Sequence, residues 1–180
     1  GLQHSNVTNL YAKAPGHHIG EITTIGSDGS RYVYGIAAYN TKQEETTFSV
    51  NNTEDCGSGL VHYTADIENS IKNISGKDNY FSNTKLPAYA HSYLLTAVLS
   101  ADYVDSDQIT GPSEGDLGTY TKFNYDKLEK IYKWRIPFNK ATFNEGYKTK
   151  VTDNKGNYLY GEKEVWYLRS IESKNYIAKF

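Results

Sequence analysis

The sequence predicts an all-β fold, built mainly of antiparallel hairpins and arranged as a sandwich or as part of a β-shell. Two observations lead to this prediction. The 180-residue chain holds 17 Tyr, 15 Gly and no Met, and short runs of aromatic and β-branched residues, which favour strands, alternate with Gly, Asn and Asp turns. We expect at most one short helix, near 66–74, where apolar residues stand at 67, 71 and 74.

Composition and charge exclude several classes of partner. The net charge is -2, with 19 basic and 21 acidic residues spread along the chain, so no basic face is available for nucleic acid or an anionic membrane. No apolar run reaches the roughly 18 residues of a membrane-spanning helix. Cys56 is the sole cysteine, which excludes an intrachain disulfide and a zinc site built on several cysteines.

The first half of the chain begins with a polar stretch, residues 1–16, that we expect to be an extended lead-in to one β-rich domain, 17–180. Its clearest element is a hairpin, because Asp28–Gly29 supplies turn residues between two strand-like runs. Residues 41–45 are predicted to be a charged connection. The strands expected in this half are 18–25, 31–39, 46–50 and 60–64.

The middle of the chain contains its weakest and its strongest strand signals. Residues 65–86 are rich in Asn, Ser and Lys, and a domain boundary, if there is one, is expected there. Residues 89–100 are apolar on both alternating faces and predict one central strand. An acidic loop, residues 101–117, separates it from a strand at 118–125.

The last third is again predicted to be β. Alternating aromatic and basic residues at 132–138 favour a strand over a helical turn at 127–133. The other expected elements are a loop at 139–147, strands at 148–152 and 157–161 around a turn at 153–156, and a final hairpin of 164–171 with 175–180.

The tyrosine-rich ending YLRSIESKNYIAKF resembles the strand–turn–strand unit of Rhs and YD-repeat proteins. The segments RYVYGIAAYN, PAYAHSYLLTAVLSADYVD, DLGTYTKFNY, YKWRIPF and DNKGNYLYGEKEVWYL are similar to part of very large secreted, Rhs-like surface proteins of gliding bacteria that use type IX secretion. The resemblance covers about 17 to 180. It implies an extracellular or cell-surface β section, whose partners are other segments of a larger chain or a secretion or surface protein.

The acidic loop is the candidate metal site. It holds five carboxylates and no basic residue, and Gly111 with Pro112 lets the chain curl back on itself. Carboxylates packed together repel one another unless they face water or surround a cation. Calcium accepts irregular sets of oxygen ligands, so we predict Ca²⁺ here, with a solvated acidic turn as the alternative. The candidate ligands are Asp102, Asp105, Asp107, Glu114 and Asp116.

Aromatic residues of the C-terminal strands form the second candidate site. Alternation along a strand places Tyr132, Trp134 and Ile136 on the face opposite Lys133 and Arg135. Aromatic rings can stack on sugars, so a glycan is a candidate ligand, whereas packing in a core is the alternative. The candidate ligand-binding residues are Trp134, Trp166, Tyr132 and Tyr160.

Three functions are consistent with the sequence. The favoured hypothesis is a non-catalytic structural or interaction module of a large exported bacterial surface or toxin-like protein, stabilised by calcium. The alternative is a carbohydrate-binding β-sandwich module that uses exposed Trp and Tyr. A hydrolase is the third, but Gly57-Ser58-Gly59 lacks the nucleophile-elbow pattern and Cys56 follows an aspartate, which would raise its thiol pKa. We therefore do not expect an enzyme.

Overall fold

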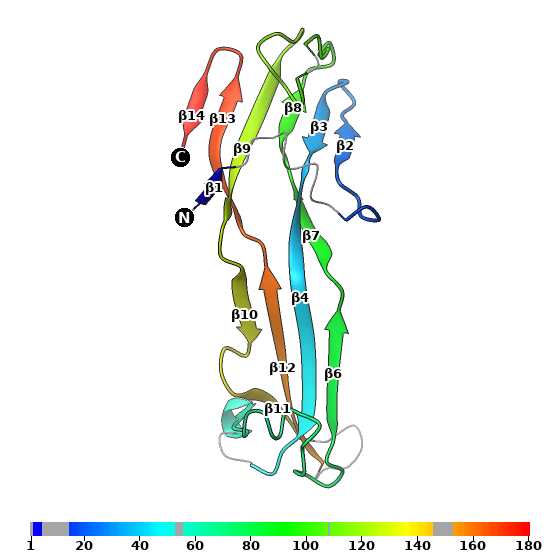
Figure 1. Cartoon of the computed structure of the whole chain (residues 1–180), viewed down its shortest axis with the longest axis vertical. Coiled ribbons are helices and arrows are strands. Elements are labelled where there is room, and N and C mark those ends of the chain that lie inside the picture. The colour runs from blue at the N-terminus through cyan, green and yellow to red at the C-terminus, as the bar shows by residue number, and fades with distance from the viewer. Residues whose placement is uncertain (1, 5–14, 53–55, 108, 146–152) are drawn as a thin grey trace. The chain divides into compact units, whose positions relative to one another are not determined.

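The computed structural model describes residues 2–4, 15–52, 56–107, 109–145 and 153–180 (Figure 1). These residues form two compact units. The first unit takes in 1–39, 89–131 and 164–180, and the second takes in 40–88 and 132–163. Strands dominate both, and the described helical structure is a single 3₁₀ turn, η2 (Cys56–Ser58). The predicted all-β class is confirmed.

The first unit contains an antiparallel sheet in the order β14-β13-β9-β8-β3-β2, with β1 also paired to β9. Strand β4 begins in this unit and continues into the second, and β7 pairs with it. The bounds are β1 (Leu2–His4), β2 (Ile22–Ile25), β3 (Arg31–Tyr34), β7 (Tyr89–Leu94), β8 (Ala97–Leu99), β9 (Tyr120–Leu128), β13 (Trp166–Ser173) and β14 (Ile177–Lys179).

The second unit contains a sheet in the order β5-β11-β12-β4-β6, and β10 also pairs with β12. Strands β10 and β11 pair with successive parts of β12, whose antiparallel pairing with β4 is the longest in the unit. The bounds are β4 (Ile36–Ser49), β5 (Leu60–Val61), β6 (Phe81–Leu86), β10 (Tyr132–Ile136), β11 (Ala141–Glu145) and β12 (Asn154–Lys163).

Both predicted hairpins with strong turn signals are present. The Gly26 N–H donates to the Ser30 carbonyl at 2.8 Å between β2 and β3. Gly29 has a φ of 82°, a conformation that glycine adopts without steric cost. Strands β13 and β14 likewise pair, and the Ser173 N–H donates to the Tyr176 carbonyl at 2.8 Å. Turn chemistry therefore located the two hairpins.

Several predicted connections are strands instead. Residues 41–45 lie inside β4, 153–156 lie mostly in β12, and β11 occupies much of the expected loop 139–147. The alternative of a helical turn at 127–133 is not formed, since β9 ends at Leu128 and β10 begins at Tyr132. The polar side chains in these strands face solvent or cross-strand partners, so polarity did not exclude strand here. The predicted strand 148–152 lies outside the described residues.

The predicted central strand 89–100 is two strands, β7 and β8, separated at Thr96. The Thr96 hydroxyl donates to the Val33 carbonyl and accepts from the Gly35 N–H, both at 3.1 Å. The Thr96 backbone is also paired, since its N–H donates to the Val33 carbonyl at 2.7 Å and its carbonyl accepts from the Phe123 N–H at 2.9 Å. The side chain therefore adds a contact, to Gly35, where the two strands meet.

Residues 66–74 form turns and no helix. The predicted apolar face does not pack, because Ile71 and Ile74 are 89% and 79% exposed. Polar side chains fix the turns instead: the Thr64 N–H donates to Glu68 at 2.6 Å, and the Asp66 N–H donates to Asn69 at 2.6 Å. Such side-chain contacts compete with a regular helix.

The whole of 65–86 lies within the second unit. The chain passes between the units after residues 39, 88, 131 and 163. Of the expected lead-in, residues 2–4 form β1, which pairs with β9. The single domain 17–180 stays a prediction.

No helix in the described part of the chain is long and apolar enough to cross a membrane.

Each unit has its own small apolar core. In the first unit, Ala97, Leu99, Tyr103 and Tyr120 are buried, with Val33 packed against them. The second core contains Phe48, Val50, Val61 and Ala141, surrounded by Tyr63, Phe81, Phe143 and Tyr158. Phe48 is fully buried, and its ring lies 4.8 Å from that of Tyr63, centre to centre.

Replacing Phe48 by alanine should lower the free energy of unfolding by about 3–5 kcal/mol, because it removes a fully buried ring and leaves a cavity. Urea unfolding followed by circular dichroism measures this change. Ile71→Ala is the matched control, since that side chain is 89% exposed and its loss should cost at most about 0.5 kcal/mol. Equal effects of the two substitutions would contradict the assignment of the core.

Candidate acidic loop site and aromatic face

The acidic loop joins β8 to β9 and is closed at its neck. Val104 and Leu117 form an isolated antiparallel bridge. Gly118 follows with a φ of 78°, and a Cβ on it would lie 2.7 Å from the Tyr103 Cα. That approach is too close for any side chain, so the neck requires glycine at 118.

Asp116 is the structural centre of the loop. It is 1% exposed, and its carboxylate accepts hydrogen bonds from the Tyr103 hydroxyl at 2.6 Å and from the Ser106 and Ser113 N–H groups at 2.9 Å. The Tyr103 hydroxyl, followed by these backbone donors, lowers the pKa of Asp116. Burial, reinforced by Asp116, raises the pKa of Tyr103. The Asp116 carboxylate therefore organises the loop in its charged form.

Three of the five predicted ligands come together. Asp105, Asp107 and Asp116 each offer a carboxylate oxygen, and these oxygens lie within 4.8 Å of one another. Asp107 also accepts from the Ile109 N–H at 2.9 Å and from the Ser113 hydroxyl. Asp102 and Glu114 lie outside this group of three. Hydrogen bonding by Ser100 lowers the pKa of Asp102.

Two basic residues reach the loop from distant parts of the sequence. Arg31, on β3, donates to the Tyr103 carbonyl at 2.7 Å, and its guanidinium carbon lies 5.5 Å from the centre of the Tyr103 ring. The Lys174 ammonium donates to the Asp116 carbonyl. The loop itself has no basic residue, and no local sequence pattern indicates these two distant partners. Their positive charges offset part of the repulsion among the acids.

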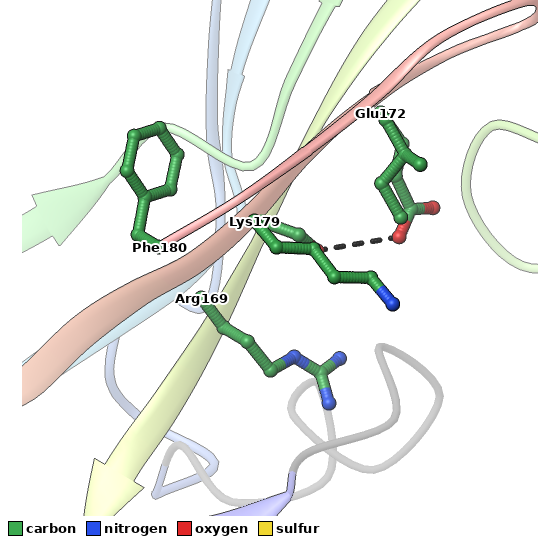
Figure 2. Close-up of a pocket in the computed structure, with 6 residues that line it drawn as sticks. Arg169, Glu172, Lys179 and Phe180 are labelled. Atoms are coloured by element: carbon green, nitrogen blue, oxygen red, sulfur yellow. Dashed lines mark hydrogen bonds between the residues drawn. The ribbon is translucent and has the colours of Figure 1, made fainter.

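The described part of the first unit has a hollow beside the acidic loop and another beside β13 and β14. The hollow beside the acidic loop is lined by apolar, polar and charged residues: Glu21, Val33, Thr96, Ala97, Leu99, Tyr103, Asp105, Gly111, Pro112 and Lys122. Figure 2 shows the other, lined by residues of β13 and β14 and by Phe180, where the Ser170 hydroxyl donates to Glu172 at 3.3 Å. In that hollow Arg169 is paired with Asp126 at 3.7 Å.

Tyr132 and Trp134 share one face of the second unit's sheet, as alternation predicts. Trp134 is paired with Gly161 of β12, and a Cβ on Gly161 would lie 2.4 Å from the indole ring. The ring therefore lies directly over the glycine. Tyr132 and Ile136, on either side, are 49% and 60% exposed. We call the side chains of Tyr132, Trp134 and Ile136 the aromatic face.

Tyr160 lies on the opposite side of the sheet, because it pairs with Arg135 rather than with Trp134. There it belongs to a row of alternating charges. Tyr160 donates to Glu162 at 2.5 Å, and the Lys42 ammonium lies 5.2 Å from the centre of its ring. The hydrogen bond to Glu162 raises the pKa of Tyr160 to about 12. Tyr160 and the aromatic face therefore cannot contact one ligand together.

Trp166 belongs to the first unit, where it pairs with Lys127 of β9. The Lys127 ammonium lies 5.6 Å from the centre of the Trp166 rings. Its indole Nε1 is buried and has no hydrogen-bond partner among the described residues. Of the four predicted aromatic ligands, Tyr132 and Trp134 are thus the two that share a surface.

The adjacent histidines, His17 and His18, contact aromatic rings. His18 stacks on Tyr39, and its Nδ1 lies 3.1 Å from the Tyr39 hydroxyl. The rings of His17 and His18 meet edge to face at 4.4 Å. The Cys56 side chain lies outside what the structure describes.

Replacing Tyr103 by phenylalanine should shift acid unfolding to higher pH. The pKa of Asp116 is lowered in the folded state, so the stability it adds is present above its unfolded pKa and is lost as pH falls through the folded value. Loss of the Tyr103 hydroxyl moves that folded pKa upward. Melting temperatures measured from neutral to acid pH test this, and Tyr176→Phe, an 81% exposed site, is the control. Identical pH profiles for both variants would contradict it.

Comparison with protein-family models, with curated proteins and with solved structures finds no match to this chain.

Proposed function

We propose that this chain is a structural and interaction module of a large exported surface protein, that it has no catalytic activity of its own, and that calcium stabilises its acidic loop. Its partners are other segments of the larger chain or a neighbouring surface protein. Export is supported by the resemblance of its segments to secreted, Rhs-like proteins. The interaction role is supported by the edges of its sheets.

The observation that carries the proposal is the exposure of large apolar side chains on the edge strands. Ile25 of β2 is 73% exposed, Ile177 of β14 is 55% exposed and Leu86 of β6 is 45% exposed. On β10, Tyr132 and Ile136 are similarly exposed. Edge strands carry unpaired backbone groups, and apolar side chains beside them favour association with another chain.

The geometry of the acidic loop supports the calcium component. Asp105, Asp107 and Asp116 bring three oxygens within 4.8 Å of one another, and calcium is bound by oxygens at irregular angles. Asp105 and Asp107 are exposed while Asp116 is buried, so an ion could enter from solvent. A bound cation would relieve the repulsion among the carboxylates.

Calcium at millimolar concentration should raise the melting temperature of the wild-type chain above its value in chelator. A ligand that binds the folded state alone adds about 2.7 kcal/mol at a hundredfold excess over its dissociation constant. Asp105→Asn/Asp107→Asn should abolish the shift. Asp102→Asn is the matched control: it removes a charge from the same loop but outside the group of three, and the shift should persist. A shift that survives the double substitution would refute this site.

An antibody raised against the chain should label intact cells of the source bacterium. On blots of the same cells it should detect a polypeptide far longer than 180 residues, because the module belongs to a larger exported protein. Fluorescence of intact and permeabilised cells, with a cytosolic protein as the control, measures exposure. Labelling that requires permeabilisation, or a band at the size of this chain alone, would contradict the proposal.

A further inference from the structure

Strand β10 has an open edge in the second unit. Among the described residues it pairs with β12 on one side and with no strand on the other. In an edge strand, every second residue directs its N–H and C=O away from the sheet, and these groups can pair with an added strand. The open edge of β10 is therefore a template for one more strand.

The two faces of β10 differ in the side chains that an added strand would meet. Tyr132, Trp134 and Ile136 stand on the aromatic face. Lys133 and Arg135 stand on the other face, opposite Glu162 and Tyr160 of β12. Successive side chains of an added strand would point to opposite faces. One set would therefore lie beside the apolar side chains of β10 and the other set beside its basic side chains.

The two basic residues are not equally available. The Arg135 guanidinium donates to the Pro137 carbonyl at 2.5 Å, to the Lys140 carbonyl at 2.6 Å and to the Tyr63 hydroxyl at 3.0 Å. The Lys133 side chain is 69% exposed, and its ammonium lies 3.9 Å from Glu162. Lys133 can therefore turn toward a carboxylate on a neighbouring strand.

The same charges disfavour a second copy as the occupant. If β10 paired antiparallel with itself, centred on Trp134, Lys133 of one copy would face Arg135 of the other. Like charges directly opposite one another destabilise strand pairs. An acidic segment would instead place its carboxylates opposite Lys133 and Arg135, and opposite charges that face one another stabilise strand pairs.

We propose that the open edge of β10 binds an extended segment of a partner in which apolar and acidic residues alternate. The segment adds a strand to the sheet, its apolar side chains covering the aromatic face and a carboxylate lying beside Lys133. This inference rests on the proposed interaction role and identifies the chemistry of the partner that the role requires.

The test uses capped, fluorescent peptides and the full chain. The first peptide alternates valine and glutamate over the length of β10, five residues, with a threonine at each end. A second carries lysine in place of glutamate. Two further versions of the first are N-methylated, one at its valines and the other at its glutamates, which together block backbone pairing along both edges.

Fluorescence anisotropy should show binding of the glutamate peptide and none of the lysine peptide. At least one N-methylated version should lose binding, because an added strand must pair through its backbone. Lys133→Glu should lower the affinity for the glutamate peptide at least about tenfold, which equals about 1.4 kcal/mol of binding free energy. The same substitution should allow the lysine peptide to bind. Trp134→Ala should also weaken binding, through loss of the aromatic face.

Lys85→Glu is the matched control. Lys85 lies on β6. Its side chain is on the same face of the sheet as that of Lys133, but β6 and β10 are at opposite edges of the sheet. Its side chain is 71% exposed and its ammonium lies 3.6 Å from Glu44. This substitution makes the same change in net charge, so it should leave binding of the glutamate peptide unchanged. Circular dichroism and melting temperature show that each variant folds, and Lys133→Gln provides a milder change at the same site.

Three results would overturn the proposal. Equal effects of Lys133→Glu and Lys85→Glu would reduce the binding to general charge attraction. Full binding of both N-methylated peptides would exclude strand addition. No peptide binding, together with Trp134-dependent binding to immobilised oligosaccharides, would make the aromatic face a sugar platform. Cell-surface labelling is independent of all three, so failure of the proposed function and failure of this inference can be distinguished.

Discussion

The antiparallel pairing of β4 with β12 is the constraint on which the second unit depends. A slip of one residue would exchange the two faces of the sheet, moving Phe48 out of the core. Two glycines of β12 show why this register is required. A Cβ on Gly156 would lie 3.0 Å from the Phe48 ring, and one on Gly161 would lie 2.4 Å from the Trp134 ring. In both places an aromatic side chain covers the bare backbone of the neighbouring strand, so the register positions the core on one face and the aromatic face on the other.

In the first unit, the buried carboxylate of Asp116 has a comparable role. Its three donors come from Tyr103, Ser106 and Ser113, so one side chain ties together both ends of the acidic loop. A buried carboxylate stays charged at little cost when donors replace its water. This explains how a loop with five acids keeps a defined shape at neutral pH. It also separates the structural acid, Asp116, from the exposed acids, Asp105 and Asp107.

Sequence patterns predicted what depends on local chemistry. The turn at Asp28–Gly29, the final hairpin of 164–171 with 175–180, the acidic loop and the alternation along β10 all follow from residues close together in the chain. Partners brought together by the fold were not predictable. Arg31 meets Tyr103 across 72 positions, and the face on which Tyr160 lies depends on its pairing with β10. The spacing of Ile67, Ile71 and Ile74 suggested a helix, but Glu68 and Asn69 bind the local backbone and prevent it.

Polar strands were mistaken for connections because part of the second unit's sheet is held by cross-strand pairs rather than by a core. Lys133, Glu162, Tyr160, Lys42, Glu44 and Lys85 form one continuous row of contacts across β10, β12, β4 and β6. Cross-strand pairs of this kind contribute roughly 0.2–1 kcal/mol each. On the opposite face of the sheet, the Lys163 ammonium lies 5.6 Å from the centre of the Tyr132 ring, and Ile136 is 60% exposed. Because Tyr132 and Ile136 stay 49% and 60% exposed, these side chains are available to a partner. Lys133, on the opposite face, belongs both to the row of contacts and to the proposed binding edge.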